Sequence, residues 1–507
     1  MAGENAPKEK QAVADEPGAN SPDIIIIGAG LAGLTAAHYL TANGIRNFKI
    51  LEARNRIGGR IMTITLGTQR IELGANWIHG VLGNPIYEYA LANKLVDITI
   101  DKKPHNVIAS TEQGKKIPIT VLQEVYEQYF WFYKKCEDYF VSKQRPTTES
   151  VGQKMEADIA NYLSGFSASE AAVRKMIFVH LLNRETCISG CDSMDEIDLA
   201  DFGAYSELPG GNLTIPLGFS SILNSLISNL KTEECILKDH PVSRIRWKLS
   251  DGTVEVECEN GEIYHSKHVI VTIPLGVLKA KHEQLFEPAL PDDKIHAIEK
   301  LGFGIVDKIF LEYERPFLHP DISEVINLWN PIENDNDVGK SWFKKIYSFM
   351  KISDTLYLAW LSGREAEHAE SITAEEIADV CTNILRQFLN DPYVPKPIRV
   401  VRTRWLSEPY TRGSYTSIRT GSKQSDIENL AKPIYVHPSD TKVCTKPTLL
   451  FAGEATHPTF FSTTHGAFVS GKCAAELLLD SSKGCVSNVD SQNSEMMSSW
   501  VEGLSLN

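Results

Sequence analysis

The chain has 507 residues, too many for one compact hydrophobic core, so two or more domains are expected. Its 42% hydrophobic and 23% charged residues are typical of a globular protein and exclude a fibrous or wholly disordered chain. The formal net charge of −14 argues against nucleic-acid binding and suits a cationic ligand, although an acidic surface can also serve solubility alone.

The two ends predict a cytoplasmic protein that does not enter a membrane. The charged N-terminus lacks the apolar core of a secretory signal, and the last three residues, Ser-Leu-Asn, differ from the peroxisomal tripeptide. Residues 1–22 and 481–507 are predicted to be flexible tails. The longest weakly charged stretch, Ile24 to Ala37, is too short to span a bilayer.

The first folded segment has the pattern of a βαβ unit. A β-branched run, Asp23 to Ile27, leads into Gly28-Ala-Gly-Leu-Ala-Gly33, a helical pattern to Leu40 and a second strand at residues 48–51. The three glycines permit a tight turn, close approach of a pyrophosphate and close helix packing. The N–H groups of Leu31 and Ala32 would then point at the phosphates.

Glu52 and Arg60 specify the nucleotide further. Glu52 ends the second strand, where a carboxylate can bind ribose hydroxyls; the alternative is a glycine-rich turn with a solvated glutamate. The run Glu52-Ala-Arg54-Asn-Arg-Ile-Gly-Gly-Arg60 favours FAD over NAD, because paired glycines let the Arg60 guanidinium turn toward the pyrophosphate.

Later segments divide between two kinds of structure. Strand patterns at 241–247, 253–258, 262–264, 268–273 and 448–452, with a helix at 466–479, predict an α/β FAD-binding domain built from 23–95, 215–300 and 421–480. An aromatic-rich helix at 121–140, an amphipathic helix at 373–389 and strands at 308–314 and 355–361 predict an α+β substrate-binding domain built from 96–214 and 301–420.

Nine cysteines without paired spacing indicate a reducing compartment and no disulfide framework. Cys187 and Cys191 are four residues apart, but no second pair accompanies them. We interpret them as packing residues and predict no metal site.

From about Asp23 to Leu479 the sequence resembles the flavin-containing amine oxidases, and within them the group that oxidises spermine and N1-acetylpolyamines. The resemblance rests on GAGLAG, EARNRIGGR, ELGANWIHG, DKIFLEYERPF, YTRGSYTS and GEATHPTFFSTTHGA. It implies a Rossmann-like FAD-binding domain of the glutathione-reductase type and a substrate-binding domain with a mixed sheet.

The resemblance implies two catalytic residues. Lys308 matches a lysine that holds a water against flavin N5, where flavin reoxidation must move protons in a dry pocket; the alternative is a lysine that extends from a sheet edge. His79 matches a substrate-facing residue that accepts a hydrogen bond from the substrate ammonium or helps to deprotonate it. The alternative for His79 is a structural histidine.

The substrate would lie between two walls. Tyr415 matches an aromatic wall beside the flavin. Thr463 stands where several amine oxidases carry the second aromatic wall, which argues against a monoamine oxidase, and Phe461 would supply apolar surface nearby. Tyr205 lies in an acidic stretch, Asp192 to Glu207, that either draws in a polycation or is simply solvated.

The remaining implied contacts concern FAD. Ser414 replaces the cysteine that monoamine oxidases join to the flavin, so FAD should be non-covalent. Glu454 matches an acid near the ribityl chain, Val242 an adenine contact, and Trp405 either a wall of the isoalloxazine or a core tryptophan. The expected FAD contacts are Gly28, Gly30, Leu31, Ala32, Gly33, Glu52, Arg54, Arg60, Trp77, His79, Gly80, Val242, Trp405, Glu454, Thr463 and Thr464.

These features predict hydride transfer from the carbon beside a neutral secondary amine to flavin N5. Molecular oxygen is then reduced to hydrogen peroxide, and the imine is hydrolysed to an amine and an aldehyde. Spermine, spermidine and N1-acetyl derivatives remain open as substrates, as does the oligomeric state. Two alternatives are an oxidase similar to histone-lysine demethylases and a non-catalytic protein similar to the escorts of prenylated GTPases.

Overall fold

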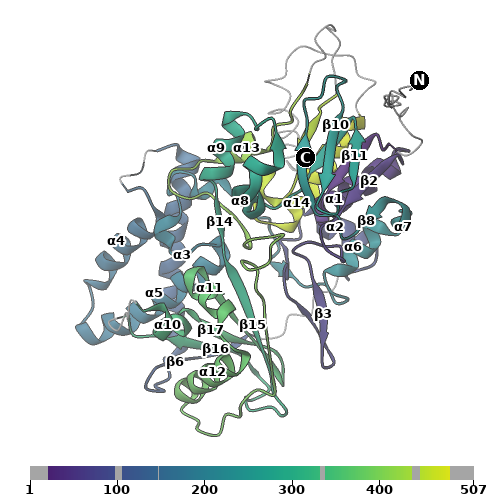
Figure 1. Ribbon diagram of the computed structural model, residues 1–507. Coiled ribbons are helices and arrows are strands. Elements are labelled where there is room, and N and C mark those ends of the chain that lie inside the picture. The colour runs from purple at the N-terminus through teal and green to yellow at the C-terminus, as the bar shows by residue number, and fades with distance from the viewer. Residues whose placement is uncertain are drawn as a thin grey trace, which may run out of the picture.

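The computed structural model describes residues 21–97, 105–144, 146, 148–331, 337–436 and 446–479. Apart from residues 21 and 22, both predicted tails lie outside the described residues. Figure 1 shows two parts that lie against each other, one around a parallel sheet and the other around a larger mixed sheet. Within the described ranges, none of the helices combines the length and apolar character needed to cross a bilayer.

The parallel sheet has five strands collected from distant parts of the chain. β1 consists of four buried isoleucines and pairs in parallel with β2 on one side and β12 on the other. Strands that are covered on both faces need such continuous apolar runs. The strands, in spatial order, are β21 (Leu449–Phe451), β12 (His268–Val271), β1 (Ile24–Ile27), β2 (Phe48–Leu51) and β8 (Ile236–Leu237).

Two helices on this sheet approach each other closely. α1 (Leu31–Ala42) packs on α14 (Thr464–Leu479), and a Cβ at Gly471 would lie only 2.1 Å from the carbonyl oxygen of Ala32. Shorter helices complete this region: α2 (Pro85–Ala92), α6 (Ser220–Ile227) and α7 (Thr232–Cys235). The α/β part of the prediction is therefore confirmed.

The alternating strands predicted between 241 and 264 form a separate four-stranded sheet beside the parallel one. Its strands, in spatial order, are β11 (Ile263–Ser266), β10 (Val254–Cys258), β9 (Val242–Arg246) and β13 (Phe286–Glu287). The helices near it are α8 (Leu275–Leu285), α9 (Asp292–Lys300) and α13 (Gln424–Ala431).

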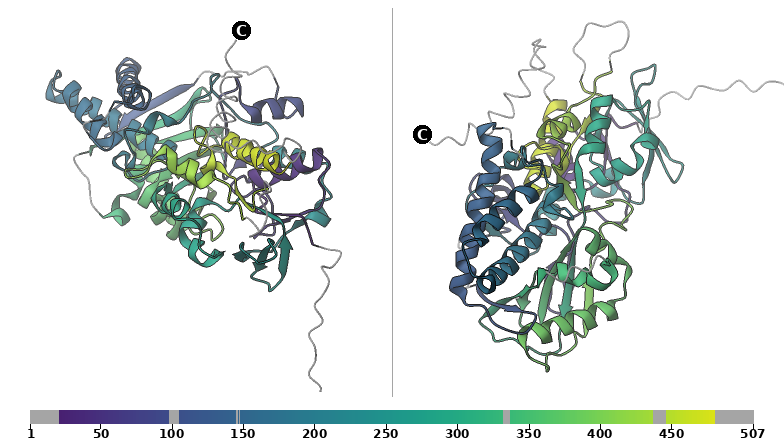
Figure 2. Two further views of the ribbon diagram at one scale, coloured as in Figure 1. Left: turned by 90° about the horizontal axis from the view of Figure 1, so that it is seen from above. Right: turned by 90° about the vertical axis from the view of Figure 1, so that its left-hand side faces the viewer.

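The mixed sheet has six strands, and helices cover both of its faces, as the turned views in Figure 2 show. On β16, Val325 packs toward α11 and α12, whereas its neighbour Ile326 packs toward α3, α4 and α5. The strands, in spatial order, are β19 (Arg399–Arg402), β15 (Val306–Glu312), β18 (Leu356–Ser362), β17 (Ser348–Ser353), β16 (Ile322–Leu328) and β6 (Asn106–Thr111). The helices are α3 (Ile119–Ser142), α4 (Val151–Leu163), α5 (Ala168–Ser189), α10 (Val338–Ser341), α11 (Gly363–Ser371) and α12 (Ala374–Leu389).

Three small two-stranded sheets tie segments that are far apart in the chain. The hairpin of β3 (Thr63–Leu66) and β4 (Gln69–Glu72) packs Leu66 and Ile71 against Phe310 of the mixed sheet. Pairing of β5 (Ile78–His79) with β7 (Asn212–Leu213) and of β14 (Gly302–Gly304) with β20 (Tyr415–Ser417) brings further site residues together. The sequence predicted none of these three pairings.

Candidate active site

A single cavity of about 1390 Å³ extends from the glycine-rich loop to helices α3 and α5. It exceeds the roughly 300–1000 Å³ of most small-molecule pockets, which suits an extended cofactor together with a substrate. Every predicted site residue except Gly33 lines it. Gly33 packs α1 onto the loop instead, since a Cβ there would lie 2.1 Å from the Gly28 carbonyl oxygen.

The glycine-rich loop leaves the start of α1 open for an anion. Gly28 has a φ of 104°, which favours glycine, and Gly30 at the N-cap brings no side chain to the helix end. The N–H groups of Leu31 and Ala32 begin the helix at the wall of the cavity. Positive helix ends of this kind bind phosphate groups.

Glu52 is buried rather than solvated, which excludes the alternative of a glycine-rich turn with a solvated glutamate. One carboxylate oxygen accepts the N–H of Ala29 at 2.8 Å and the other accepts the N–H of Arg54 at 3.0 Å. Each carboxylate oxygen has a further lone pair, so the group can still accept hydroxyl hydrogens from the cavity.

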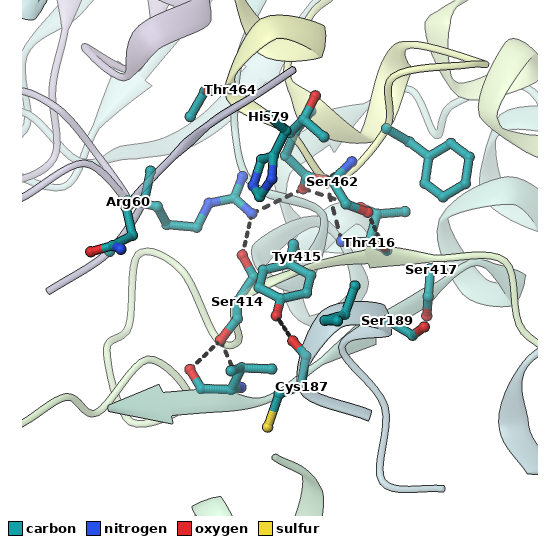
Figure 3. A pocket seen from close by; sticks show the side chains of 18 of the residues that line it. Arg60, His79, Cys187, Ser189, Ser414, Tyr415, Thr416, Ser417, Ser462 and Thr464 are labelled. Carbon is teal, nitrogen blue, oxygen red and sulfur yellow. Dashed lines mark hydrogen bonds and ion pairs between the residues drawn. The ribbon is translucent and has the colours of Figure 1, made fainter. Parts of the chain in front are cut away.

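Arg60 and Glu454 form an ion pair between distant segments, and Figure 3 labels the Arg60 side of it. Arg60 Nη1 donates to Glu454 Oε1 at 2.9 Å and to the Ser414 carbonyl at 2.6 Å. Glu454 also accepts the N–H groups of Thr416 and Ser462. The prediction placed Arg60 on the pyrophosphate, whereas one of its two terminal nitrogens is engaged by this link.

Two polar atoms support the fit of a nucleotide cofactor. Arg54 Nε and Thr464 Oγ1 are buried at the cavity but have no hydrogen-bond partner among the described residues. Buried polar atoms are rarely left without a partner, so a ligand that bonds to them is expected. Together with the open helix end and Glu52, these atoms fit a bound FAD.

Lys308 is buried on β15 and lines the cavity, which excludes the alternative of a lysine extending into solvent. Its Nζ donates to the carbonyl oxygens of Glu72 and Gly74, both at 2.7 Å. Burial lowers the pKa of Lys308 to about 7. A neutral amine has two N–H groups and one lone pair, so these two carbonyls use both hydrogens and leave the lone pair available to a water.

Tryptophans surround this amine. The Trp360 ring lies 4.6 Å from Lys308 Nζ and stacks on Trp77 with 5.6 Å between ring centroids. Trp405 donates from Nε1 to the Leu73 carbonyl at 3.2 Å. Sequence reasoning missed Trp360, which lies directly opposite Lys308 in the register of β15 and β18.

His79 presents one ring nitrogen to the cavity. Its Nδ1 lies 3.1 Å from Asn212 Oδ1, which can only accept, so Nδ1 carries the hydrogen in the neutral ring. Nε2 is then an acceptor. Burial lowers the pKa of His79, which favours this neutral form.

The substrate walls are positioned by short-range contacts. The Tyr415 hydroxyl donates to the Cys187 carbonyl at the end of α5, as Figure 3 shows. Ser414 Oγ accepts a hydrogen bond from the Val306 N–H and donates one to the Val306 carbonyl, both at 2.9 Å. Thr463 caps α14 by accepting the Gly466 N–H at 3.0 Å.

The acidic stretch 192–207 contributes only part of its charge to the cavity. Asp201 and Glu207 line it, and Tyr205 packs edge-on against Phe461 with 5.8 Å between centroids. Asp192, by contrast, accepts the Arg364 N–H at 2.9 Å and lies outside the cavity wall. A role for this stretch in drawing in a polycation stays a prediction.

Sequence reasoning missed an acid that lies on α5. Glu185 is buried at the cavity and accepts hydrogen bonds from Ser189 at 3.2 Å and from Tyr129 and Tyr133 at 3.4 Å. Burial raises the pKa of Glu185 to about 7. The signal in the sequence was the spacing of Tyr126, Tyr129 and Tyr133, which lie on one face of α3.

Among the described residues, no cluster of three histidine, cysteine or acidic side chains has the geometry to hold a metal ion. Cys187 and Cys191 are both buried with free thiols. Burial raises the pKa of Cys187 to about 12, which makes its thiol unreactive.

Comparison with known proteins supports a redox role. Residues 31–479 match the model of the family of flavin containing amine oxidoreductases. The chain is 34% identical to the peroxisomal N(1)-acetyl-spermine/spermidine oxidase of Bos taurus, over 92% of this chain and 96% of the relative. It is 30% identical to the probable polyamine oxidase 5 of Arabidopsis thaliana, over 90% and 98%.

A solved structure of a putrescine oxidase double mutant, redesigned in its cofactor binding, resembles the fold with a TM-score of 0.64. It is 17% identical and covers 90% of this chain and 99% of that one. At this identity the likeness concerns the fold alone.

Proposed function

The chain belongs to the family of flavin containing amine oxidoreductases, and we propose that it is an FAD-dependent oxidase of polyamines. When bound, non-covalent FAD would accept a hydride from the carbon beside a secondary amine and pass the electrons to O2, giving hydrogen peroxide. Hydrolysis of the imine product would yield an amine and an aldehyde. The environment of Lys308 is the observation that carries this proposal most strongly.

Lys308 would hold a water at its lone pair and move protons at the reacting centre. Its two carbonyl partners fix the direction of that lone pair, and the lysine is buried with the Trp360 ring against its amine. General acid–base groups work best with a pKa near the working pH, and burial brings the pKa of Lys308 to about 7. A lysine left at its ordinary pKa would stay charged and have no lone pair.

Cationic substrates fit the charges of the cavity. Glu185 at one wall and Glu207 near His79 supply negative charge, while Tyr205, Phe461 and Tyr415 supply aromatic surface for the methylene chain. His79 Nε2 would accept a hydrogen from the reacting ammonium, and the neutral amine that forms can release hydride. Two acids separated by aromatic surface suit a substrate with more than one amine.

We also propose that the chain is divided into two domains. The parallel sheet supports an FAD-binding domain made of 23–95, 215–300 and 421–480, and the mixed sheet supports a substrate-binding domain made of 96–214 and 301–420. The β3–β4 hairpin belongs to the first set by sequence but packs on the mixed sheet. It would couple the two domains at the Glu72 and Gly74 carbonyls that hold Lys308.

Purified full-length protein tests the function directly. We expect a yellow protein whose flavin is released by acid precipitation, and peroxide release with spermine or N1-acetylspermine. A colourless protein that takes up no added FAD would contradict the proposal and favour a non-catalytic protein such as an escort. Peroxide release with methylated histone peptide but not with polyamines would favour the demethylase alternative.

The compartment needs its own measurement. The bovine relative is named as peroxisomal, whereas the sequence predicted a cytoplasmic protein. Fluorescence microscopy of the full chain, labelled at an internal exposed loop, distinguishes a punctate peroxisomal pattern from a diffuse cytoplasmic one.

A further inference from the structure

Two buried carboxyl groups, Asp307 and Glu370, lie behind the segment that carries Trp405. Asp307 is the neighbour of Lys308 on β15, so its side chain points to the opposite face of the sheet. Glu370 lies near the end of α11. The residues are only 2% and 6% exposed, and neither lines the cavity.

The two groups hold the backbone of 403–407 from one side. Asp307 Oδ1 accepts the Thr403 hydroxyl at 2.5 Å and the Trp405 N–H at 3.3 Å. Glu370 accepts the N–H groups of Leu406 at 2.8 Å and Ser407 at 2.9 Å. Three successive backbone N–H groups therefore end on these two carboxyls.

The second carboxyl oxygen of Asp307, Oδ2, indicates that a proton lies between Asp307 and Glu370. Oδ2 is buried and receives no hydrogen bond from a described donor. Burial, with the neighbouring Glu370 carboxylate adding to it, raises the pKa of Asp307 to about 7. Two carboxylates so close in a dry site cannot both ionise without a large cost. Asp307 Oδ2 is the oxygen that no described donor reaches, which places the proton on Asp307.

We propose that Asp307 and Glu370 share one proton and act together as positioning residues for Trp405, an inference that rests on the FAD-dependent function proposed above. The proton sits on Asp307 Oδ2 and faces Glu370, while Asp307 Oδ1 and the Glu370 carboxylate accept from the 403–407 segment. No proton leaves the pair during turnover.

The 403–407 segment affects Lys308 through two contacts. The Thr403 hydroxyl accepts the Lys308 N–H at 2.9 Å, and Trp405 Nε1 donates to Leu73, between the two residues whose carbonyls hold Lys308 Nζ. A Cβ on Gly74 would already lie 3.3 Å from the Trp405 ring. A shift of Trp405 would therefore disturb both the flavin wall and the Lys308 amine.

Other charges near the pair are cationic. Arg402 on β19 interacts with both carboxyls, and its guanidinium donates to the Ala369 and Ile372 carbonyls. Arg404 is a further cation that interacts with Arg402. From β18 the partner of Asp307 is the apolar Leu361. Glu370 is thus the acid that opposes ionisation of Asp307.

The test compares Asp307→Asn with Asp307→Ala. Asparagine presents a carbonyl oxygen to Thr403 and Trp405 and an N–H to Glu370, the same pattern as a protonated aspartic acid. We expect Asp307→Asn to keep the wild-type visible circular dichroism of bound flavin and its FAD affinity. Asp307→Ala should bind FAD about 10-fold more weakly, because the Trp405 N–H loses its acceptor.

A pH series supplies the second measurement. The raised pKa means that folded Asp307 holds its proton where the unfolded chain does not, so this contribution to stability is lost as pH rises toward about 7. The Tm of the wild type should therefore fall by a few degrees relative to Asp307→Asn between pH 5 and pH 8.

The shared proton would be overturned if the Tm difference between the wild type and Asp307→Asn stayed the same from pH 5 to pH 8. It would also be overturned if Asp307→Asn lost FAD affinity as Asp307→Ala does. The Tm comparison needs no flavin, so it still decides the matter if Asp307→Ala fails to fold. A wild type that never binds FAD would instead refute the proposed function.

Discussion

Two buried lysines in this molecule differ in how their amines are used. Lys294 on α9 donates to the carbonyls of Asn429, Leu430 and Lys432 at 2.7–2.9 Å and lies over the Phe451 ring. Lys308 has only two carbonyl partners among the described residues, and it faces the cavity. Burial lowers the pKa of both amines to about 7.

The contrast shows that a shifted pKa alone does not identify a chemical group. The three carbonyls at the end of α13 match the three hydrogens of an ammonium, so Lys294 caps a helix and has nothing left to offer a ligand. Lys308 keeps one position open toward the cavity. The same distinction separates His79, which has one ring nitrogen free toward the cavity, from His180, which has both engaged.

The largest effect should follow from substitution of Lys308, the lysine that keeps one position open toward the cavity. Lys308→Met should slow anaerobic flavin reduction or reoxidation by about 10²–10⁴-fold, the usual contribution of a general acid–base group. Lys308→Arg should be nearly as slow, because a guanidinium stays charged and has no lone pair. Stopped-flow absorbance measures both; a Lys308→Arg enzyme with wild-type rates would show that charge alone is needed.

Glu185 extends the comparison to acids. Glu185→Gln should raise the KM for a polyamine about 10–100-fold, the loss of a charge-assisted hydrogen bond of about 1.5–3 kcal/mol. Glu324 also lines the cavity, but it pairs with the basic side chain of His105 at 2.9 Å, whereas the partners of Glu185 are hydroxyl groups. Glu324→Gln is therefore the matched control and should change KM less.

The same variant predicts a pH effect. Because burial raises the pKa of Glu185 to about 7, its charge is lost as pH falls below that value, and the wild-type KM for a polyamine should rise there. Glu185→Gln should lack this component of the KM profile. Steady-state kinetics from pH 5.5 to 9 checks this, and identical profiles for both proteins would remove Glu185 from substrate binding.

Lys294, whose amine is held by three carbonyls, should affect stability rather than rate. Lys294→Met leaves buried carbonyls at the end of α13 without donors and should lower the free energy of unfolding by about 1–3 kcal/mol. Chemical denaturation measures this loss. A fall in the rate per bound flavin, with stability unchanged, would reverse the assignment of Lys294.

The histidines should show the smallest difference. Asn212→Ala removes the partner that fixes the tautomer of His79 and should lower kcat/KM about 3- to 10-fold, the net worth of one hydrogen bond. His180 has both ring nitrogens engaged, by the Tyr126 hydroxyl at 2.9 Å and the Tyr347 carbonyl at 3.2 Å. Tyr126→Phe is therefore the control, and an equal loss there would argue against a special role for His79.

Local patterns carried most of the correct predictions. The isoleucine run of β1, the glycines of the loop and Glu52 lie within one short segment, where β-branched periodicity and spacing specify the geometry. Lys308 was found through the family resemblance of its motif; it lines the cavity, and its role at the flavin stays a prediction. Gly33 lies outside the cavity wall and packs a helix closely, as the glycine spacing predicted, and its contact with FAD stays a prediction.

The parts that were missed depend on pairings between remote segments. Trp360 meets Lys308 only through the register of two strands, and Glu185 meets Tyr129 only through packing of α5 on α3. The acid pair of Asp307 and Glu370 needs β15 beside α11. No periodicity within either segment records such a contact.

Rapid mixing of the purified holoprotein with spermine in the absence of oxygen tests the central claim most directly, because the open position of Lys308 should govern chemistry at the bound flavin. We expect the flavin absorbance to bleach quickly in the wild type and in Lys294→Met. In Lys308→Met, bleaching, or its return when oxygen is admitted, should be slower by orders of magnitude. A Lys308→Met protein that completes both phases at wild-type rates would contradict the account.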